Sequence, residues 1–287
     1  MDSKAVSWLN GFVGVAIFAG SLPATRVAVL GLDPFFLTGA RAVVAALLAA
    51  SWLLIGRVAR PQKSDLPSLA LVGFGVVLGF PLLTALALQH ITSAHSIVFL
   101  GLLPLCTALF GVILAGERHK PVFWVFSVLG SALVVSYAAR EGLDVAWQGD
   151  LYMLAAVVVC GMGYAEGGRL SRRLGGWQVI CWALVLSLPF MLVMMIWFWP
   201  ASFSGVASSA WVGFAYVSVF SMFLGFVFWY RGLAQGGIAA VGQLQLLQPF
   251  MGLGLAAALL GEAVNASMVW VTVGAALCVA GARRFAS

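Results

Sequence analysis

The sequence has very little charge. Of its 287 residues, 8% are Asp, Glu, Lys or Arg and 63% are hydrophobic. A soluble domain carries about 25% charged residues, so this chain has too few to cover a surface that faces water. No long polar stretch remains that could build a separate soluble domain. The composition therefore predicts an integral membrane protein surrounded by a lipid bilayer.

Cysteine is scarce, and the motifs of enzymes are missing. The four cysteines lie singly in apolar segments and form no CxxC pair, which favours packing residues over disulfides or metal ligands. No glycine-rich phosphate loop precedes a basic residue, and no group of His, Asp and Glu has metal-ligand spacing. We therefore predict no enzyme activity, no catalytic residue, no metal site and no cofactor.

The apolar runs predict an all-α protein with ten transmembrane helices. A span needs about 20 apolar residues, and two charge-free runs, 66–116 and 174–230, are too long for one helix. The polar segments QHITSAH at 89–95 and PASFSGVASSA at 200–210 have the chemistry of turns that divide them. The predicted spans are approximately 7–30, 34–56, 66–89, 92–115, 121–139, 149–170, 176–199, 206–231, 237–260 and 265–284.

The basic residues indicate the orientation of these spans. The net charge of +6 does not predict nucleic-acid binding, because Lys and Arg occur in short clusters between apolar runs. Such clusters are typical of cytoplasmic loops. With the N-terminus inside, the clusters within 57–63, 118–120, 169–173 and 283–284 face the cytoplasm, whereas Arg140 faces outward. The prediction is a multi-pass protein with both termini in the cytoplasm and no nucleic-acid partner.

The two halves of the chain resemble each other weakly but in order. The matches are LGF before Gln89 with LGF before Gln235, Pro104 before Gly116-Glu117 with Pro249 before Gly261-Glu262, and the segments 130–135 with 274–279. Each half holds five predicted spans, and an odd number inverts the second half relative to the first. Inverted repeats are typical of secondary transporters, whose site lies near the midplane between the repeats. We therefore predict inverted five-helix repeats at 1–145 and 146–287; a duplicated scaffold serving an enzyme or receptor is the alternative.

Repeats that each end in Pro…Gly-Glu and continue into Gly-x-Ala-Leu-x-Val resemble the drug/metabolite transporter superfamily with paired EamA domains. The segments PLCTALFGVILAGER at 104–118 and QPFMGLGLAAALLGE at 248–262 carry the resemblance, which covers essentially the whole chain. Within the superfamily the chain is similar to YddG-type exporters of aromatic and other neutral amino acids. The resemblance implies a small-molecule substrate, alternating access and a bacterial inner membrane. The oligomeric state stays open, a monomer included.

Small and polar residues at mid-depth of the spans predict the substrate site. A proline in a helix frees a carbonyl that must face protein or a water-filled cavity, and unpartnered amides in an apolar run are costly. In GQLQLLQP at 242–249, Gln245 and Gln248 share a face, whereas Gln243 points elsewhere and is expected to bond a neighbouring helix. Helix–helix packing is the alternative role for these residues. The predicted substrate-binding residues are Ser21, Phe80, Thr84, His95, Ser96, Phe99, Leu100, Leu103, Tyr164, Ser221, Gln245 and Gln248, and the predicted helix breaks or gates are Pro23, Pro81, Pro104 and Pro249.

The few charges inside the spans limit the mechanism. Glu166 and Arg169 are expected to form an i, i+3 ion pair. Arg26 and Arg41 either bind Asp33 or helix-end carbonyls, or hold a substrate carboxylate. Because no carboxylate is predicted near the midplane, we expect facilitated export without a proton relay. The alternatives are drug or metabolite export by proton antiport, with His95 as the titratable group, and a channel, which the absence of a charge ring disfavours.

Overall fold

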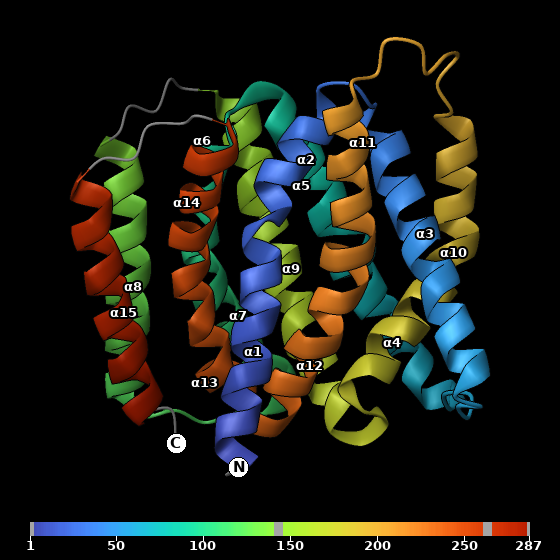
Figure 1. Cartoon of the computed structure of the whole chain (residues 1–287). Helices are drawn as coiled ribbons and strands as arrows, with labels where there is room; N and C mark the ends of the chain where they lie inside the picture. The colour runs from blue at the N-terminus through green and yellow to red at the C-terminus, as the bar shows by residue number, and fades with distance from the viewer. Residues whose placement is uncertain (1–2, 141–145, 261–265, 286–287) are drawn as a thin grey trace.

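The chain folds into one bundle of helices that stand side by side (Figure 1). The computed structural model describes residues 3–140, 146–260 and 266–285, and every regular element in these ranges is a helix. The start of α1 (Ser3–Ala19) and the end of α15 (Ala266–Phe285) lie at the same end of the bundle (Figure 1). We call this the terminus end and the opposite one the distal end.

Among the described residues, seven helical segments are long and apolar enough to cross a membrane, and Pro121–Leu133 is a shorter apolar helix. These segments confirm the prediction of an all-helical membrane protein, while the number ten stays a prediction. The seven are Ala5–Val29, Pro34–Ile55, Lys63–His90, His95–Ala115, Trp147–Leu174, Gly176–Trp197 and Ser208–Gly236.

Many of the long helical segments consist of several shorter helices that follow one another along the chain. In the first half, after α1, the elements are α2 (Ser21–Val29), α3 (Pro34–Ile55), η1 (Lys63–Asp65), α4 (Leu66–Val72), η2 (Gly73–Gly79), α5 (Phe80–His90), α6 (Ser93–Phe99), η3 (Leu100–Leu102), α7 (Leu103–Ala115) and α8 (Pro121–Arg140). In the second half they are α9 (Trp147–Leu174), α10 (Gly176–Trp197), α11 (Ser208–Ala215), η4 (Tyr216–Leu224), α12 (Gly225–Gly236), α13 (Ile238–Gly242), η5 (Gln243–Leu247), α14 (Gln248–Leu260) and α15.

The predicted helix-breaking prolines lie where the helix geometry changes. Pro81, Pro104 and Pro249 are each the second residue of an α-helix, and the turns before them are π-helical in η2 and 3₁₀-helical in η3 and η5. Pro23 follows the interruption between α1 and α2 at Gly20. Proline has no N–H to donate and its ring clashes with the preceding turn, so the helix before it changes its hydrogen bonding.

The irregular turns occur in pairs, one in each half of the chain. The π-helical segment η2 has a counterpart in η4, and the 3₁₀ segment η3 has one in η5. Long π-helical segments are rare and occur mostly at functional sites. The sequence matches between the halves therefore coincide with matching departures from α-helical geometry.

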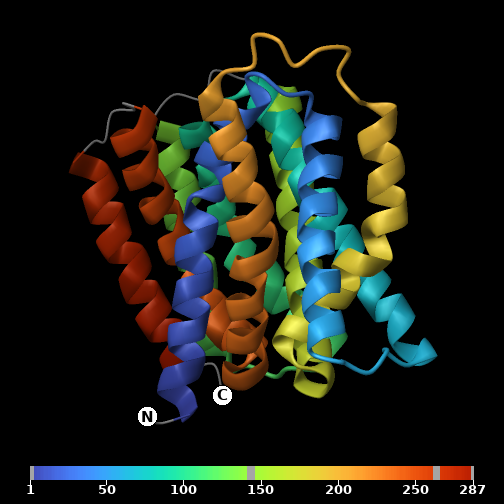
Figure 2. The same ribbon diagram turned by 45° about the vertical axis from the view of Figure 1, so that its right-hand side comes forward.

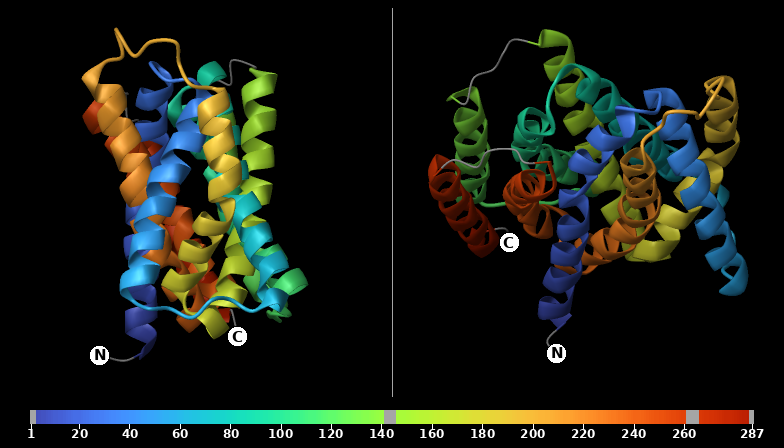
Figure 3. Two further views of the ribbon diagram at one scale, coloured as in Figure 1. Left: turned by 90° about the vertical axis from the view of Figure 1, so that its right-hand side faces the viewer. Right: turned by 45° about the horizontal axis from the view of Figure 1, so that its top comes forward.

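Helices from the two halves pack against each other in pairs. The helix α3 packs on α10, α1 on α12, α5 on α9, α7 on α13 and α8 on α15. The pair of α3 and α10 lies on one side of the bundle, away from α14 and α15 (Figure 2). The pair of α8 and α15 forms the opposite edge (Figure 3, right). The middle of the bundle is thus bounded by helices of both halves.

Glycines let α9 and η2 cross closely at this middle. A Cβ atom added to Gly75 would lie 2.6 Å from the carbonyl oxygen of Val159 and 2.9 Å from the Cα of Gly163. Real Cβ atoms essentially never make contacts this short. The two backbones can therefore touch only because these positions lack side chains.

Candidate substrate site

A small internal cavity lies between elements of both halves, at the level of Tyr164 in α9 and Ser221 in η4. The cavity encloses about 20 Å³, enough for roughly one water molecule. Its lining comes from α1, α2, α3, η2, α5, α9, η4, α12 and α14. The lining residues are Phe18, Ser21, Leu22, Arg41, Val76, Phe80, Pro81, Tyr164, Ser221, Phe226 and Gln248.

The polar side of the cavity is built from residues distant in sequence. The hydroxyl oxygens of Ser21 and Ser221 lie 2.7 Å apart and share a hydrogen bond. Arg41 is 5% exposed, and its Nη2 donates to Ser221 Oγ at 3.3 Å and to the Val217 carbonyl at 3.2 Å. Gln248 donates weakly to the Phe18 carbonyl at 3.5 Å, and its buried Oε1 has no partner among the described residues.

The apolar side of the cavity is aromatic. The ring centroids of Phe18 and Phe226 lie 4.9 Å apart, and those of Phe18 and Tyr164 lie 6.1 Å apart with the rings nearly parallel. Trp229 closes the cluster, 5.2 Å from Tyr164. Tilted and stacked rings at these distances attract each other beyond their burial. The cavity therefore joins a hydrogen-bonding side to an aromatic side.

The structure brings five of the predicted binding residues together here: Ser21, Phe80, Tyr164, Ser221 and Gln248, with Pro81 beside them. The other predicted residues do not line this cavity. Gln245 is fully buried and donates to Thr107 Oγ1 of α7 at 3.3 Å. Thr84 and Ser96 donate back to carbonyls of their own turns, Leu100 and Leu103 are buried in the core, and Phe99 stacks on His95.

The prediction for Gln243 is wrong. Both side-chain polar atoms of this residue are buried, and they bond no neighbouring helix within the described ranges. The prediction assumed α-helical rotation of about 100° per residue. Gln243 begins the 3₁₀ segment η5, in which each residue turns by about 120°, so its direction differs from the α-helical estimate.

Arg26 and Arg41, which sequence reasoning treated together, behave differently. Arg26 donates to the carbonyl of Leu88 near the end of α5, as the helix-end alternative predicts. Asp33 binds neither arginine: it accepts from the backbone N–H groups of Phe35 and Phe36 and so caps α3. Arg41, in contrast, reaches the cavity.

His95 has a partner that sequence reasoning missed. Its Nε2 lies 2.7 Å from a carboxylate oxygen of Asp150, which joins α6 to the first turn of α9. The two residues are 55 positions apart, so no local spacing could have indicated the pair. The interaction lies outside the cavity lining.

Ion pairs at the terminus end hold the last turns of α9. The predicted pair of Glu166 and Arg169 is confirmed, with Arg169 Nε 2.9 Å from Glu166 Oε2. The next two arginines pair with acids of other elements, Arg172 with Glu117 after α7 and Arg173 with Asp65 of η1. These contacts join the end of α9 to the segment after α7 and to η1.

Glu117 also caps α13. The backbone N–H groups of Ile238 and Ala239 donate to its two carboxylate oxygens at 3.0 and 2.9 Å. Burial opposes ionisation, but hydrogen bonds from His119 and from these two amides, together with the charge of Arg172, outweigh burial and lower the pKa of Glu117 from its ordinary 4.5 to about 2. The related Gly261-Glu262 lies outside the described residues.

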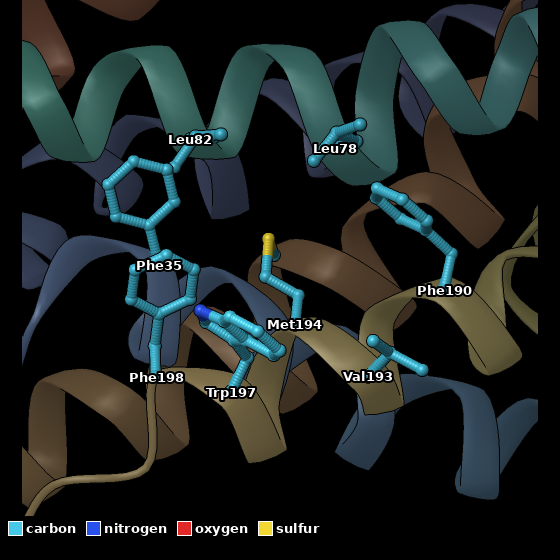
Figure 4. A pocket seen from close by; sticks show the side chains of 8 residues that line it. All are labelled: Phe35, Leu78, Leu82, Phe190, Val193, Met194, Trp197 and Phe198. Carbon is cyan, nitrogen blue, oxygen red and sulfur yellow. The ribbon is translucent and has the colours of Figure 1, made fainter.

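A second pocket, of about 360 Å³, opens on the flank of the bundle between α3, α5 with η2, and α10. Its lining is apolar, with the rings of Phe35 and Phe198 stacked 4.5 Å apart at one side (Figure 4). Trp197 is 82% exposed and Phe190 59%, so this wall faces the membrane. The lining has no charged, hydroxyl or amide side chain for a polar solute, and the central cavity is the better candidate site.

A helical bundle with a buried cavity between its halves, and no cluster of His, Cys, Asp and Glu suited to a metal among the described residues, has the architecture of a membrane transporter. The chain belongs to the EamA-like transporter family, which matches residues 5–136 and again 147–283. This result confirms the resemblance to the drug/metabolite transporter superfamily with two EamA domains, and the chain is a transporter, not an enzyme.

Among the proteins similar to this chain are two curated relatives and a solved structure. It is 62% identical over 286 residues to the uncharacterized transporter YdeK of Bacillus subtilis (strain 168), with 100% of both chains covered. It is 29% identical over 296 residues to the probable terminal-alkyne amino-acid exporter of Streptantibioticus cattleyicolor, with 97% of this chain and 92% of the relative covered. A crystal structure of a protein 20% identical has a TM-score of 0.77 over 96% of this chain and 97% of its own, which shows the fold.

Proposed function

We propose that this protein is a secondary transporter that exports small neutral metabolites, with aromatic and other neutral amino acids as the first candidates. The observation that carries the proposal is the central cavity, which Ser21, Ser221 and Gln248 line together with Phe18 and Phe226. A zwitterion with an apolar side chain needs both surfaces. The name of the Streptantibioticus relative, a probable amino-acid exporter, supports the same substrate class.

The proposed architecture is two inverted five-helix repeats, 1–145 and 146–287, with ten spans in all. Three observations support it: the paired irregular turns, the pairing of helices between the halves, and the opposite directions of α1 and α9 (Figure 1). We place the protein in a bacterial inner membrane with both termini in the cytoplasm. The positively charged terminus end, with Arg169, Arg172 and Arg173, supports this orientation.

Transport requires that the cavity widen, because an amino acid is much larger than about 20 Å³. We propose that it opens alternately to the two membrane faces, with Pro23, Pro81, Pro104 and Pro249 at the helix breaks where the segments bend. The same segments then serve as gates. The described helices η2 and η4, whose hydrogen bonding is already irregular, adjoin the cavity and support this assignment.

We propose facilitated export down the substrate gradient, since no carboxylate lines the cavity among the described residues. The second candidate is proton antiport, which the contact of His95 with Asp150 favours. An acid and an imidazole in contact are a common way to carry a proton inside a membrane protein. The dependence of transport on a pH gradient separates the two.

The test is counterflow of labelled leucine and phenylalanine into proteoliposomes of the purified protein, without a pH gradient. We expect saturable counterflow, and its absence for every neutral amino acid would contradict the proposal. Ser221→Phe fills the cavity and should abolish counterflow. Ser51→Phe is the matched control because Ser51 is exposed on α3; it should leave counterflow intact. Unitary conductance steps in planar bilayers would instead indicate a channel.

A further inference from the structure

Arg41 carries a buried positive charge that no carboxylate of the described residues pairs with. The residue is 5% exposed, and its Nε is buried and makes no hydrogen bond among the described residues. Its Nη2 donates only to neutral oxygens, those of Val217 and Ser221. Ion pairs within the described ranges join other residues, and none includes Arg41.

A charge in this position calls for an anion. Guanidinium stays protonated in proteins, and an intramembrane charge is normally paired or faces a water-filled cavity. The Arg41 side chain cannot reach the membrane surface, because it is almost completely enclosed. It lines the cavity instead, so an anion that enters the cavity can become its partner.

The neighbours of Arg41 suit a carboxylate in particular. The planar guanidinium offers parallel N–H donors that match the two oxygens of a carboxylate. The hydroxyls of Ser21 and Ser221, 2.7 Å apart, lie on the same side of the cavity, and Ser221 already contacts Arg41. A hydroxyl can rotate to donate to an incoming oxygen, so three donor groups converge on one place.

The rest of the cavity lining offers an acceptor and apolar surface. Gln248 Oε1 is buried without a partner among the described residues, and a neutral oxygen can accept from an ammonium group. Phe18, Phe80 and Phe226 supply the aromatic surface. A molecule with a carboxylate at Arg41 therefore has its ammonium group and its side chain on surfaces that fit them.

We propose that Arg41 anchors the carboxylate of the exported molecule, with the Ser21 and Ser221 hydroxyls as additional donors. This inference rests on the proposed function and deepens it: substrates are carboxylates, with α-amino acids as the fitting class. Analogues without the carboxylate are rejected, because they leave the guanidinium unpaired in an internal cavity.

The first arm of the test uses the unmodified protein. Phenylalanine, 3-phenylpropanoate and phenylalaninamide compete with labelled phenylalanine in counterflow. We expect the amide to compete at least ten-fold more weakly than phenylalanine, since it lacks the anionic group. Weak competition by 3-phenylpropanoate, which lacks the ammonium group, shows that the ammonium group also contributes to binding. Competition as strong as that of phenylalanine shows that the carboxylate is recognised without it. An amide that competes as well as phenylalanine overturns the proposal.

The second arm compares Arg41→Lys and Arg41→Gln with Arg26→Gln. Arg41→Lys keeps the positive charge but loses the parallel N–H donors of the planar guanidinium. We expect this variant to have a roughly ten-fold higher KM for phenylalanine. We also expect that phenylalanine no longer raises its unfolding temperature. Arg26→Gln changes an arginine outside the cavity lining, so its KM and its thermal stabilisation by phenylalanine should equal those of the unmodified protein. If Arg41→Gln fails to fold, the KM of Arg41→Lys and the competition by phenylalaninamide still test the role of Arg41 as the carboxylate anchor. A KM for Arg41→Lys equal to that of the unmodified protein overturns the proposal.

The two arms also separate this inference from the proposed function. In one outcome, phenylalanine counterflow proceeds normally and neither substitution of Arg41 nor amidation of the substrate carboxylate changes it. That result keeps the proposed amino-acid exporter and contradicts the Arg41 anchor. An unmodified protein that moves neither amino acids nor 3-phenylpropanoate and is stabilised by neither contradicts the proposed function, and the anchor with it.

Discussion

The carboxylate of Glu117 accepts a hydrogen bond of 3.0 Å from the backbone N–H of Ile238, 121 residues further along the chain. This contact joins the end of α7 to the start of α13 at the terminus end. Gly116 makes it possible: its φ of 65° ends α7 in the left-handed region, which glycine adopts without strain. The chain then turns and directs Glu117 towards the unpaired amides of α13.

We expect Glu117→Gln to lower the free energy of unfolding by roughly 1–3 kcal/mol, because charged acceptors at a helix start are stronger than neutral ones. Glu117→Ala should lose more, since it leaves two amides and Arg172 without their partner. Thermal unfolding of the purified protein in detergent measures both. Equal stability of all three proteins would show that the cap contributes nothing.

The Glu117 contribution should depend on pH in a defined direction. Its pKa is lowered to about 2 in the folded protein from an ordinary 4.5, so the unfolded chain takes up the proton first. The stabilisation is present above about pH 4.5 and is lost as the pH falls towards 2. The difference in unfolding midpoint between the unmodified protein and Glu117→Gln should therefore stay constant from pH 8 to 5 and shrink at pH 3. A difference that grows at pH 3 would contradict this assignment.

Gly75→Ala should destabilise the crossing of η2 and α9. The new methyl group would lie 2.6 Å from the Val159 carbonyl oxygen, so the helices must separate, at a cost of about 1–3 kcal/mol. Gly254→Ala is the matched control, because no described atom lies within 4 Å of its Cβ position. Unfolding midpoints check the pair, and a larger loss for Gly254→Ala than for Gly75→Ala would refute the close crossing.

Gln248→Ala should affect substrate binding, whereas Gln245→Ala should affect stability. Gln248 lines the cavity, whereas Gln245 donates to Thr107 on α7. We expect Gln248→Ala to raise the KM for phenylalanine several-fold, and Gln245→Ala to lower stability by about 1 kcal/mol with KM unchanged. Counterflow kinetics and thermal unfolding distinguish the two effects. Normal amounts of a Gln248→Ala protein with normal KM would remove Gln248 from the site.

Asp150→Asn should keep transport while weakening the tie between α6 and α9. The amide can still bond His95, but the carboxylate that now contacts the imidazole is lost. If export is facilitated, counterflow rates of both proteins should be the same with and without an imposed pH gradient. A rate in the unmodified protein that requires the gradient, and that Asp150→Asn abolishes, would establish proton antiport instead.

Much of the fold was predictable because membranes impose strong local constraints. Backbone groups in lipid must be paired within a helix, so long apolar runs indicate helices, and the loops between them carry the charges. Contacts within one helical turn were also predictable, as the confirmed pair of Glu166 and Arg169 shows. Neither the partner of His95 nor the residue capped by Glu117 has any local signal, because each lies on a distant helix.

The site was predictable only in part. Mid-depth polarity pointed to Ser21, Ser221 and Gln248, and the structure places all three in the lining of one cavity. The same reasoning included residues such as Thr84 and Ser96, whose hydroxyls bond their own turns. It also misjudged Gln243, because the local change from α to 3₁₀ geometry in η5 has no clear mark in the sequence.

By itself, the sequence determined that this protein is helical, lies in a membrane and contains two related halves, because apolar length, charge placement and repeated motifs are properties of the chain. The tertiary structure decided what surrounds two superficially similar arginines. Arg26 meets a helix-end carbonyl, and Arg41 meets a cavity whose lining, in the described part of the chain, contains no carboxylate. Whether a charge is paired depends on what other helices place beside it, and only packing brings Ser221 to Arg41 across 180 residues of chain.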